Sequence, residues 1–339
     1  MKKVRTDDAV GSILCQDITR IVPGEFKGAA FKKGHIITPE DVPELLKLGK
    51  DHLFVWENKP GFIHENEAAE RLAKAVGGKN VSLTMPSEGK INLLAEASGL
   101  LKVDRAVLNR VNGCEQVVLA TRHNNILVKR GEVLAGTRVV PLVIEEQKIK
   151  VVEDICAENP VLEVKPLGQF KVGVINTGNE VFYGRIKDSF GPVLRQKFAE
   201  LGSNVVKQVF APDDQTIITA TIHEFIQAGI EFIAISGGMS VDPDDLTPGA
   251  IKASGAEVVG YGAPVLPGSM VMVAYLGKVP VVGLPGCVMY AKSTVFDLIV
   301  PRLLAGEKVT KQDLTDLGYG GLCLQCPECN YPVCPFGKA

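Results

Sequence analysis

The stretch that decides the fold is "IEFIAISGGMSVDPDDLTPGAIKASG", residues 230–255. Its first seven residues form an apolar run that predicts a buried strand. Gly237 and Gly238 follow at once and predict a tight turn. Thr247 with Pro248 then predicts the N-cap and first turn of a short helix. Strand, glycine turn and helix in this order are the repeating unit of parallel α/β sheets.

The same alternation extends on both sides of this stretch, over residues 168–306. Strands are expected at 170–178 and 204–214, and helices at 188–202, ending at Gly202, and 215–229, ending at Gly229. Two apolar strands turning at Gly277-Lys278 follow, and "CVMYAKSTVFDLIVPRLLAG" (287–306) predicts a closing helix. This order predicts a doubly wound α/β domain with a mostly parallel sheet.

The remainder of the chain predicts three further regions. Residues 1–60 have mixed α/β signals, with a helix capped at Thr38 and ending at Gly49, then a strand over 52–56. Residues 61–167 predict a small β-rich region that contains one helix near 65–78 and strand-like segments such as "KIKVVEDI" (148–155). Residues 307–339 are expected to form a linker and a cysteine-rich tail.

Composition excludes several classes of protein. The chain has 339 residues, 46% of them hydrophobic, and a formal net charge of -2. This charge argues against broad nucleic-acid binding, which needs many cations. The most apolar stretch, 271–291, is interrupted by Lys278, glycines and prolines, so no membrane span is expected. The opening ten residues lack the apolar core of a secretory signal, and we expect a cytoplasmic protein.

Polar and glycine residues follow the predicted strands, where open α/β sheets bind their ligands. "NTGNE" supplies Thr177, Gly178 and Glu180, although any strand needs a turn to leave the sheet. The next turn offers Ser236, Gly237, Gly238 and Ser240, whose backbone N–H groups and hydroxyls suit an anion. Together these residues predict a phosphate-binding edge.

The aspartates Asp242, Asp244 and Asp245 would repel a phosphate in this position. A cation such as Mg²⁺ resolves the conflict, because it binds carboxylates on one side and phosphate oxygens on the other. The alternative is a solvated acidic loop that caps the next helix, and for Asp245 this alternative weighs equally. Asp242 and Asp244 are the better candidates for a functional role.

Two further turns complete the predicted edge. "GLPGCVM" places Pro285 and Gly286 between a buried strand and the last helix, and "PVLPGSM" places Ser269 at the entrance of a strand. Either segment could be an ordinary turn without a role in binding. Several glycine turns converging on one edge of one sheet favour a binding site.

The order TGNE, PDD, SGG with clustered aspartates, PGS and GLPG resembles the molybdopterin-binding domain of molybdenum-cofactor biosynthesis proteins, over about 168–306. The longer architecture is similar to the molybdenum insertases. This resemblance implies that Thr177, Gly178 and Glu180 contribute to a pterin-phosphate and metal site. It also implies that residues 236–240 form the phosphate loop, that Asp242 and Asp245 lie among acidic ligands, and that Pro285 and Gly286 form the family's LPG turn.

The resemblance implies a function in molybdenum-cofactor biosynthesis. The protein would bind molybdopterin, or its adenylylated form, with Mg²⁺, insert molybdate and release AMP. In this reaction the catalytic residues Glu180, Asp242 and Asp244 would hold metal or water. It would act as a homodimer and could contact other molybdenum-cofactor proteins or molybdoenzymes.

The sequence departs from the insertase pattern at several positions. The family has Asp where Asn179 stands and Asn-Pro where Cys287-Val288 stand, and its N-terminal "SAMDGYA" segment is replaced by "PGEFKGAAF". Ligand binding survives these departures better than catalysis. The alternatives are therefore a non-catalytic pterin carrier or regulator, and an adenylyltransferase or pyrophosphatase-like hydrolase on the same fold.

The tail contains "CLQCPECNYPVC", with Cys323, Cys326, Cys329 and Cys334 spaced C-x2-C-x2-C-x4-C. Four thiols this close together make a poor disulfide framework in a reducing compartment and predict metal ligation. The triple spacing resembles an iron–sulfur run, and two zinc knuckles more often stand further apart, so an iron–sulfur cluster is slightly favoured. Zn²⁺ is the alternative, because tetrahedral sulfur coordination suits both. The tail could sense redox state or metal supply, or dock a partner.

Overall fold

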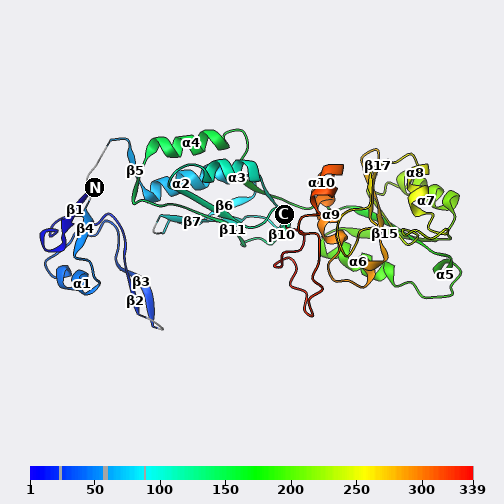
Figure 1. Cartoon of the computed structure of the whole chain (residues 1–339), viewed down its shortest axis with the longest axis horizontal. Coiled ribbons are helices and arrows are strands. Elements are labelled where there is room, and N and C mark those ends of the chain that lie inside the picture. The colour runs from blue at the N-terminus through cyan, green and yellow to red at the C-terminus, as the bar shows by residue number, and fades with distance from the viewer. Residues whose placement is uncertain (23–24, 56–59, 88, 339) are drawn as a thin grey trace. The chain divides into compact units, whose positions relative to one another are not determined.

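The computed structural model describes residues 1–22, 25–55, 60–87 and 89–338. The chain divides into two compact units (Figure 1). Unit 1 comprises 1–96, 103–122 and 131–163, and unit 2 comprises 97–102, 123–130 and 164–339. In the described part of the chain, no helix has both the length and the apolar character needed to cross a bilayer.

Unit 1 is built from short antiparallel sheets and helices. Its strands pair as β1 (Lys2–Arg5) with β4 (His52–Val55), β2 (Ile18–Val22) with β3 (Phe26–Phe31), and β5 (Phe62–His64) with β12 (Val143–Glu145). A four-stranded sheet has the order β6 (Val81–Leu83), β7 (Lys90–Ala95), β11 (Val133–Val139), β9 (Val117–Thr121). The helices are η1 (Thr6–Asp8), α1 (Asp41–Lys47), α2 (Glu65–Val76), α3 (Arg105–Asn112) and α4 (Glu146–Cys156).

The region after residue 60 carries more helix than the sequence pattern predicted. The segment "KIKVVEDI", predicted as a strand, lies inside α4. Its buried residues are Ile149, Val152 and Cys156, which recur at the spacing of one helix face rather than of a strand. The expected helix at residue 65 is present as α2, whereas α1 begins at Asp41 without a side-chain cap, so the predicted cap at Thr38 was wrong. Pro23, Gly24 and Trp56 lie outside the described residues.

Unit 2 contains the predicted α/β domain. Its main strands are β14 (Lys171–Thr177), β15 (Asn204–Ala211), β16 (Phe232–Ser236), β17 (Glu257–Tyr261), β18 (Met272–Leu276) and β19 (Val279–Leu284). Its helices are α5 (Asn179–Phe182), α6 (Phe190–Glu200), α7 (Gln215–Gln227), α8 (Thr247–Ala253), η2 (Gly286–Met289), α9 (Val295–Leu304) and α10 (Lys311–Asp316). A small sheet of β10 (Ile126–Val128), β8 (Gly99–Val103) and β13 (Leu162–Lys165) completes the set.

The six-stranded sheet has the order β15-β14-β16-β19-β18-β17. The first four of these strands are parallel, and only β18 in this sheet runs antiparallel to its neighbours, β19 and β17. The doubly wound and mostly parallel fold is therefore confirmed. Successive residues of β14 point to opposite faces: Val174 packs with α6 and α9, and Ile175 packs with α7 and α8. Both faces of the sheet are therefore covered by helices (Figure 1).

The end of the α/β domain differs from the expectation in one helix. The segment predicted as a helix from Cys287 is broken: η2 ends at Met289, and α9 begins only at Val295. Thr294 starts α9 through a reciprocal capping box with Asp297, which fixes the boundary locally. The strand turn expected at Gly277-Lys278 is present, with Leu276 paired to Val279.

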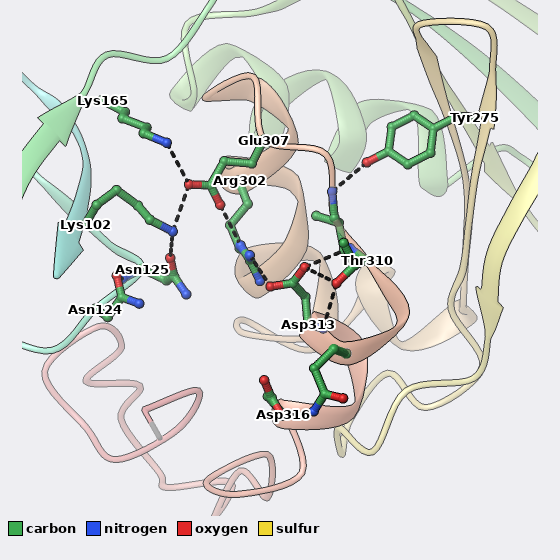
Figure 2. Close-up of polar contacts among 12 residues, drawn as sticks. Lys102, Asn124, Asn125, Lys165, Tyr275, Arg302, Glu307, Thr310, Asp313 and Asp316 are labelled. Carbon is green, nitrogen blue, oxygen red and sulfur yellow. Dashed lines mark hydrogen bonds and ion pairs between the residues drawn. The ribbon is translucent and has the colours of Figure 1, made fainter. Parts of the chain in front are cut away.

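A buried ion network joins the small sheet to the end of α9 (Figure 2). Arg302 donates to Glu307 at 2.9 Å and to Asp313 at 2.6 Å, and the side chains of Arg302 and Glu307 are each only 11% exposed. Lys102 of β8 and Lys165 of β13 approach the other oxygen of Glu307, at 2.7 and 3.3 Å. One carboxylate thus connects strands and a helix that lie far apart in the sequence.

Candidate functional site

The candidate site begins where two adjacent parallel strands end. Thr177 is the last residue of β14 and Ser236 the last of β16, and the two strands are neighbours in the sheet. The chain leaves β14 toward α6 on one face and leaves β16 toward α8 on the other. This reversal is a topological switch point, the place where open α/β sheets form a ligand crevice.

Side chains at the switch point lock the two strand ends together. Asn176 Nδ2 donates to Ser236 Oγ at 2.8 Å, and Thr177 Oγ1 donates to the carbonyl of Ser236 at 3.3 Å. All three residues are buried. Their buried hydroxyl and amide groups therefore fix the positions at which the two loops leave the sheet.

The glycine turn after β16 is held in close contact with β14. Gly237 and Gly238 have φ values of +95° and +57°, in the region that favours glycine. A Cβ on Gly237 would lie 2.2 Å from the carbonyl oxygen of Thr177. Without a Cβ in the way, the backbone N–H groups of such a turn can approach an anion closely.

Thr247 has a different role from the predicted one. The structure makes it the first residue of α8, with Leu246 as N-cap, so the expected capping by Thr247 was wrong. Its hydroxyl instead donates to the carbonyl of Gly237 at 2.9 Å and lies 3.2 Å from Thr177 Oγ1. The buried side chain thus fixes the glycine turn against both strands, a tertiary contact that local cap rules do not anticipate.

The acidic loop closes on itself beside this turn. The backbone N–H of Asp242 donates to the Asp245 carboxylate at 3.0 Å, and the N–H of Asp245 returns to the carbonyl of Asp242 at 2.9 Å. Asp242 and Asp244 are exposed, as are Ser240 and Glu180. Tyr261 donates through its hydroxyl to the carbonyls of Met239 and Ser240, at 2.8 and 3.2 Å, and supports the loop from β17.

Asp213 is an acidic residue of this site that the sequence analysis did not assign. Burial raises the pKa of Asp213, the N–H of Asn179 acts against this, and the charges of Glu180, Asp244 and Asp245 raise the pKa further. Four carboxylates from three loops therefore lie within electrostatic range of one another. The "PDD" segment after β15 indicates an acidic turn at the end of a strand. The sequence does not show its role, because the partners of Asp213 come from distant positions in the chain.

We expect Asp213→Asn to stabilise the protein without ligand at pH 8, with a rise in melting temperature of about 2 °C. A pKa raised by folding means that ionised Asp213 opposes folding, and this cost disappears as the pH falls through the raised value. The gain over wild type should therefore shrink toward pH 4, and thermal unfolding between pH 4 and 8 measures it. A constant difference at all pH values would contradict the electrostatic origin.

The remaining predicted residues also reach this edge of the sheet. Pro285 and Gly286 directly follow β19, the parallel neighbour of β16. Ser269 precedes β18, whose first residue pairs with Gly283 of β19, and therefore lies at the same end. The turns at 177–180, 236–245 and 285–286 are thus brought together by adjacent strands.

The four cysteines of the tail line one cavity of about 390 Å³, and all four are free thiols. Across the described residues, no three His, Cys, Asp or Glu side chains are already placed to hold a metal ion. A hydrogen bond from Ser293 and a second from the backbone N–H of Tyr331 lower the pKa of Cys329. Metal ligation by Cys323, Cys326, Cys329 and Cys334 stays a prediction.

These features define an α/β domain with glycine turns and carboxylates at the switch point of its sheet. Residues 173–305 match a family model described as "Probable molybdopterin binding domain", and residues 3–57 match "Domain of unknown function (DUF8806)". The part of unit 2 that contains the site is thus a match to a molybdopterin-binding family.

Curated relatives match shorter stretches. A CinA-like protein of Mycobacterium leprae (strain TN) is 32% identical over 77 residues, 23% of this chain and 18% of the relative. A CinA-like protein of Mycobacterium sp. (strain JLS) is 31% identical over 90 residues, 26% of this chain and 21% of the relative. The matches span about a fifth of the length of these relatives.

Solved structures that are similar to part of this chain include proteins of molybdopterin biosynthesis. The enzyme MoaB of Thermus thermophilus is 20% identical, with a TM-score of 0.35, and the alignment covers 41% of this chain and 98% of MoaB. The Mog protein of Mycobacterium ulcerans is 19% identical, with a TM-score of 0.31 and coverage of 40% and 92%.

Proposed function

We propose that unit 2 binds molybdopterin, or its adenylylated form, at the switch point of the sheet, in molybdenum-cofactor biosynthesis. The observation that carries the proposal is the convergence of the turns after β14, β16 and β19 on one edge, inside the segment that matches a molybdopterin-binding family. Glycine turns of this kind offer backbone N–H groups to phosphate oxygens. The phosphate end of the pterin would lie against Gly237 and Gly238.

The acidic residues fit a magnesium ion that arrives with the phosphates. Mg²⁺ binds proteins through one or two carboxylates and completes its shell with phosphate oxygens and water. Asp213, Glu180, Asp244 and Asp245 interact electrostatically and offer such oxygens. A bound Mg²⁺ would neutralise phosphate charge and would also relieve the repulsion that the other three carboxylates exert on Asp213.

The reaction we propose is insertion of molybdate into adenylylated molybdopterin. The two dithiolene thiols of the pterin displace one oxygen of molybdate, which leaves as water with the two thiol protons. A second water cleaves the phosphoanhydride bond, AMP leaves, and the pterin retains its own phosphate. In this step, the glycine turn would hold the phosphates in place and Glu180, Asp242 and Asp244 would position water or metal. Fixed backbone dipoles aimed at developing charge are an effective means of stabilising such a transition state.

A non-catalytic pterin carrier is the second candidate, and Asn179 favours it. The backbone N–H of Asn179 donates to Asp213 at 2.9 Å, and its side-chain oxygen accepts from the Asp213 N–H at 3.3 Å. Asn179 stands where insertases have an acidic residue, and its side chain is used here to hold the loop at Asp213. A carrier needs the phosphate-binding turns and has no need of an acidic group at this position.

The experiment measures binding of molybdopterin to the full chain, with and without Mg²⁺. The intrinsic fluorescence of the pterin reports the binding. We expect Asp244→Asn to weaken Mg²⁺-dependent binding of the adenylylated pterin about tenfold, by the loss of one cation contact worth about 1.4 kcal/mol. Glu257→Gln, a change of the same charge at a 72% exposed side chain that pairs with Lys308, is the matched control.

Chromatographic detection of AMP after addition of adenylylated molybdopterin and molybdate separates the two candidates. Release of AMP supports insertion, and tight binding without AMP supports the carrier. If the wild-type protein binds neither form of the pterin, the proposed function is wrong.

A further inference from the structure

The cavity of the cysteine tail (residues 319–338) joins the tail to two segments of the α/β domain. Its volume is about 390 Å³, and all four tail cysteines contribute to its wall. The opposite wall is formed by Pro267 and by residues 290–293. The cysteines come from one short segment, whereas the facing wall comes from the loops that precede β18 and α9.

The tail is held against the domain by backbone and aromatic contacts. The N–H of Leu266 donates to Gly321, and the N–H of Cys323 returns to Leu266, both at 2.8 Å. Phe336 is only 2% exposed, and Tyr331 donates to the carbonyl of Asp297 at 3.1 Å. The positions of the cysteines are therefore set by the fold of unit 2.

The usual structural explanation for a cysteine does not cover this cluster. Cysteines without a reactive role are mostly small buried hydrophobes. Cys326 and Cys329 are exposed, and Cys323 and Cys334 are half-buried. Burial thus explains the cysteines Cys15 and Cys156 of unit 1 but not the four that share the cavity.

Polar groups already lie within hydrogen-bond distance of two of the sulfur atoms. The backbone N–H of Gln325 donates to Cys323 Sγ at 3.5 Å, and the φ of Gln325 is +51°. The hydroxyl of Ser293 lies 3.3 Å from Cys329 Sγ. Such donors stabilise the charge of metal-bound thiolates and orient them.

We propose that Cys323, Cys326, Cys329 and Cys334 ligate a metal centre in this cavity, and that the bound centre stiffens the adjoining loops of the pterin site. Four thiolates select a thiophilic centre, either a tetrahedral zinc ion or an iron–sulfur cluster. Either would draw the sulfur atoms inward from the walls of the cavity, because metal–sulfur bonds are only about 2.3 Å long.

The coupling follows from chain continuity and rests on the proposed function. Pro267 is followed directly by Gly268 and Ser269, which lie at the pterin edge of the sheet. Residues 290–293 follow η2, which begins at Gly286 of the same edge. A centre that fixes Pro267 and Ser293 thus reduces the freedom of two loops that must be ordered when a pterin binds.

The test starts with metal analysis and an absorption spectrum of the full chain, purified without oxygen and also reconstituted with zinc or with iron and sulfide. We expect one centre per chain, with visible absorption if it is an iron–sulfur cluster and none if it is zinc. Cys326→Ser should remove it, whereas Cys114→Ser, at a half-buried thiol of unit 1, should retain it. Circular dichroism checks that both variants are folded.

The outcomes separate the centre from the coupling and from the proposed function. A wild-type chain that takes up no metal, with all four tail thiols open to alkylation, would overturn the proposal, as would equal metal loss in Cys114→Ser. With the centre present, we expect metal-free Cys326→Ser to bind molybdopterin about tenfold more weakly. Unchanged affinity overturns the coupling alone. A metal-loaded chain that binds no molybdopterin overturns the proposed function and leaves the centre in place.

Discussion

Glu307→Gln should lower the free energy of unfolding of unit 2 by about 3 kcal/mol at pH 7, because it removes one partner of a buried ion network. The carboxylate of Glu307 contacts Lys102, Lys165 and Arg302 with its two oxygens (Figure 2). Glutamine keeps the shape of the side chain and loses the charge. Lys102, with a side chain only 20% exposed, would then lose the carboxylate with which it pairs.

The effect of Glu307→Gln should depend on pH in a defined direction. Burial alone would raise the pKa of Glu307, but hydrogen bonds from Lys102 and Arg302 outweigh burial and lower it. A pKa lowered by folding contributes stability above the unfolded value of about 4.3, and this contribution is lost as the pH falls through the folded value. The difference between wild type and variant should therefore shrink below about pH 4.

Urea unfolding of the full chain, combined with hydrogen exchange of peptides from unit 2, measures this difference. The matched control is Glu257→Gln, whose carboxylate is 72% exposed and lies 3.4 Å from Lys308. An exposed pair of this kind contributes less than about 1 kcal/mol. Equal effects of the two substitutions would show that burial of Glu307 does not determine its contribution.

Gly237→Ala should abolish pterin binding and lower the free energy of unfolding by about 3 kcal/mol. This cost combines the strain of a positive φ at alanine with a steric clash of the new Cβ. Its φ is +95°, and the new Cβ would lie 2.2 Å from the carbonyl oxygen and 2.8 Å from the hydroxyl of Thr177. Thr177 ends β14 and is fixed in the sheet between Ala211 and Ser236. The turn must therefore move away from the strand and take its backbone N–H groups out of place.

Gly255→Ala is the matched control for this prediction. Gly255 has a similar φ of +82°, and a Cβ there would meet nothing within 4 Å. It should cost only the conformational strain, about 1 kcal/mol, and leave molybdopterin binding unchanged. Thermal unfolding and fluorescence titration of both variants give the comparison. If Gly237→Ala binds molybdopterin as tightly as the control does, the glycine turn is not the phosphate site.

The alternation of apolar runs, glycines and caps was sufficient to predict most of the α/β domain. The strand β16 and the helix α7 start within two residues of the predicted positions, and Gly202 and Gly229 follow α6 and α7 at positive φ. These features depend on neighbours within one turn of the chain, so local sequence determines them. The convergence of the loops was also predictable, since parallel strands share a carboxyl edge.

Predictions failed where tertiary contacts outweigh local preference. The hydroxyl of Thr247 could cap a helix, but the structure uses it to hold Gly237 beside Thr177. The alternation in "KIKVVEDI" suits a strand, and only a partner surface for Ile149, Val152 and Cys156 selects the helix. Thr294 and Asp297 already indicate in the sequence that a helix starts there, which separates α9 from η2. The prediction gave more weight to the apolar run across 287–306 and missed this boundary.

The sequence by itself determined the order of strands and helices, the glycine turns and the presence of four closely spaced thiols. Tertiary structure alone decided which residues meet: Asp213 with the carboxylates of two other loops, Lys102 with Glu307, and the cysteine tail with Pro267 and Ser293. The physical reason is that backbone preference and periodicity act over a few residues. Charge coupling and cavity formation depend on groups that only the folded chain brings together.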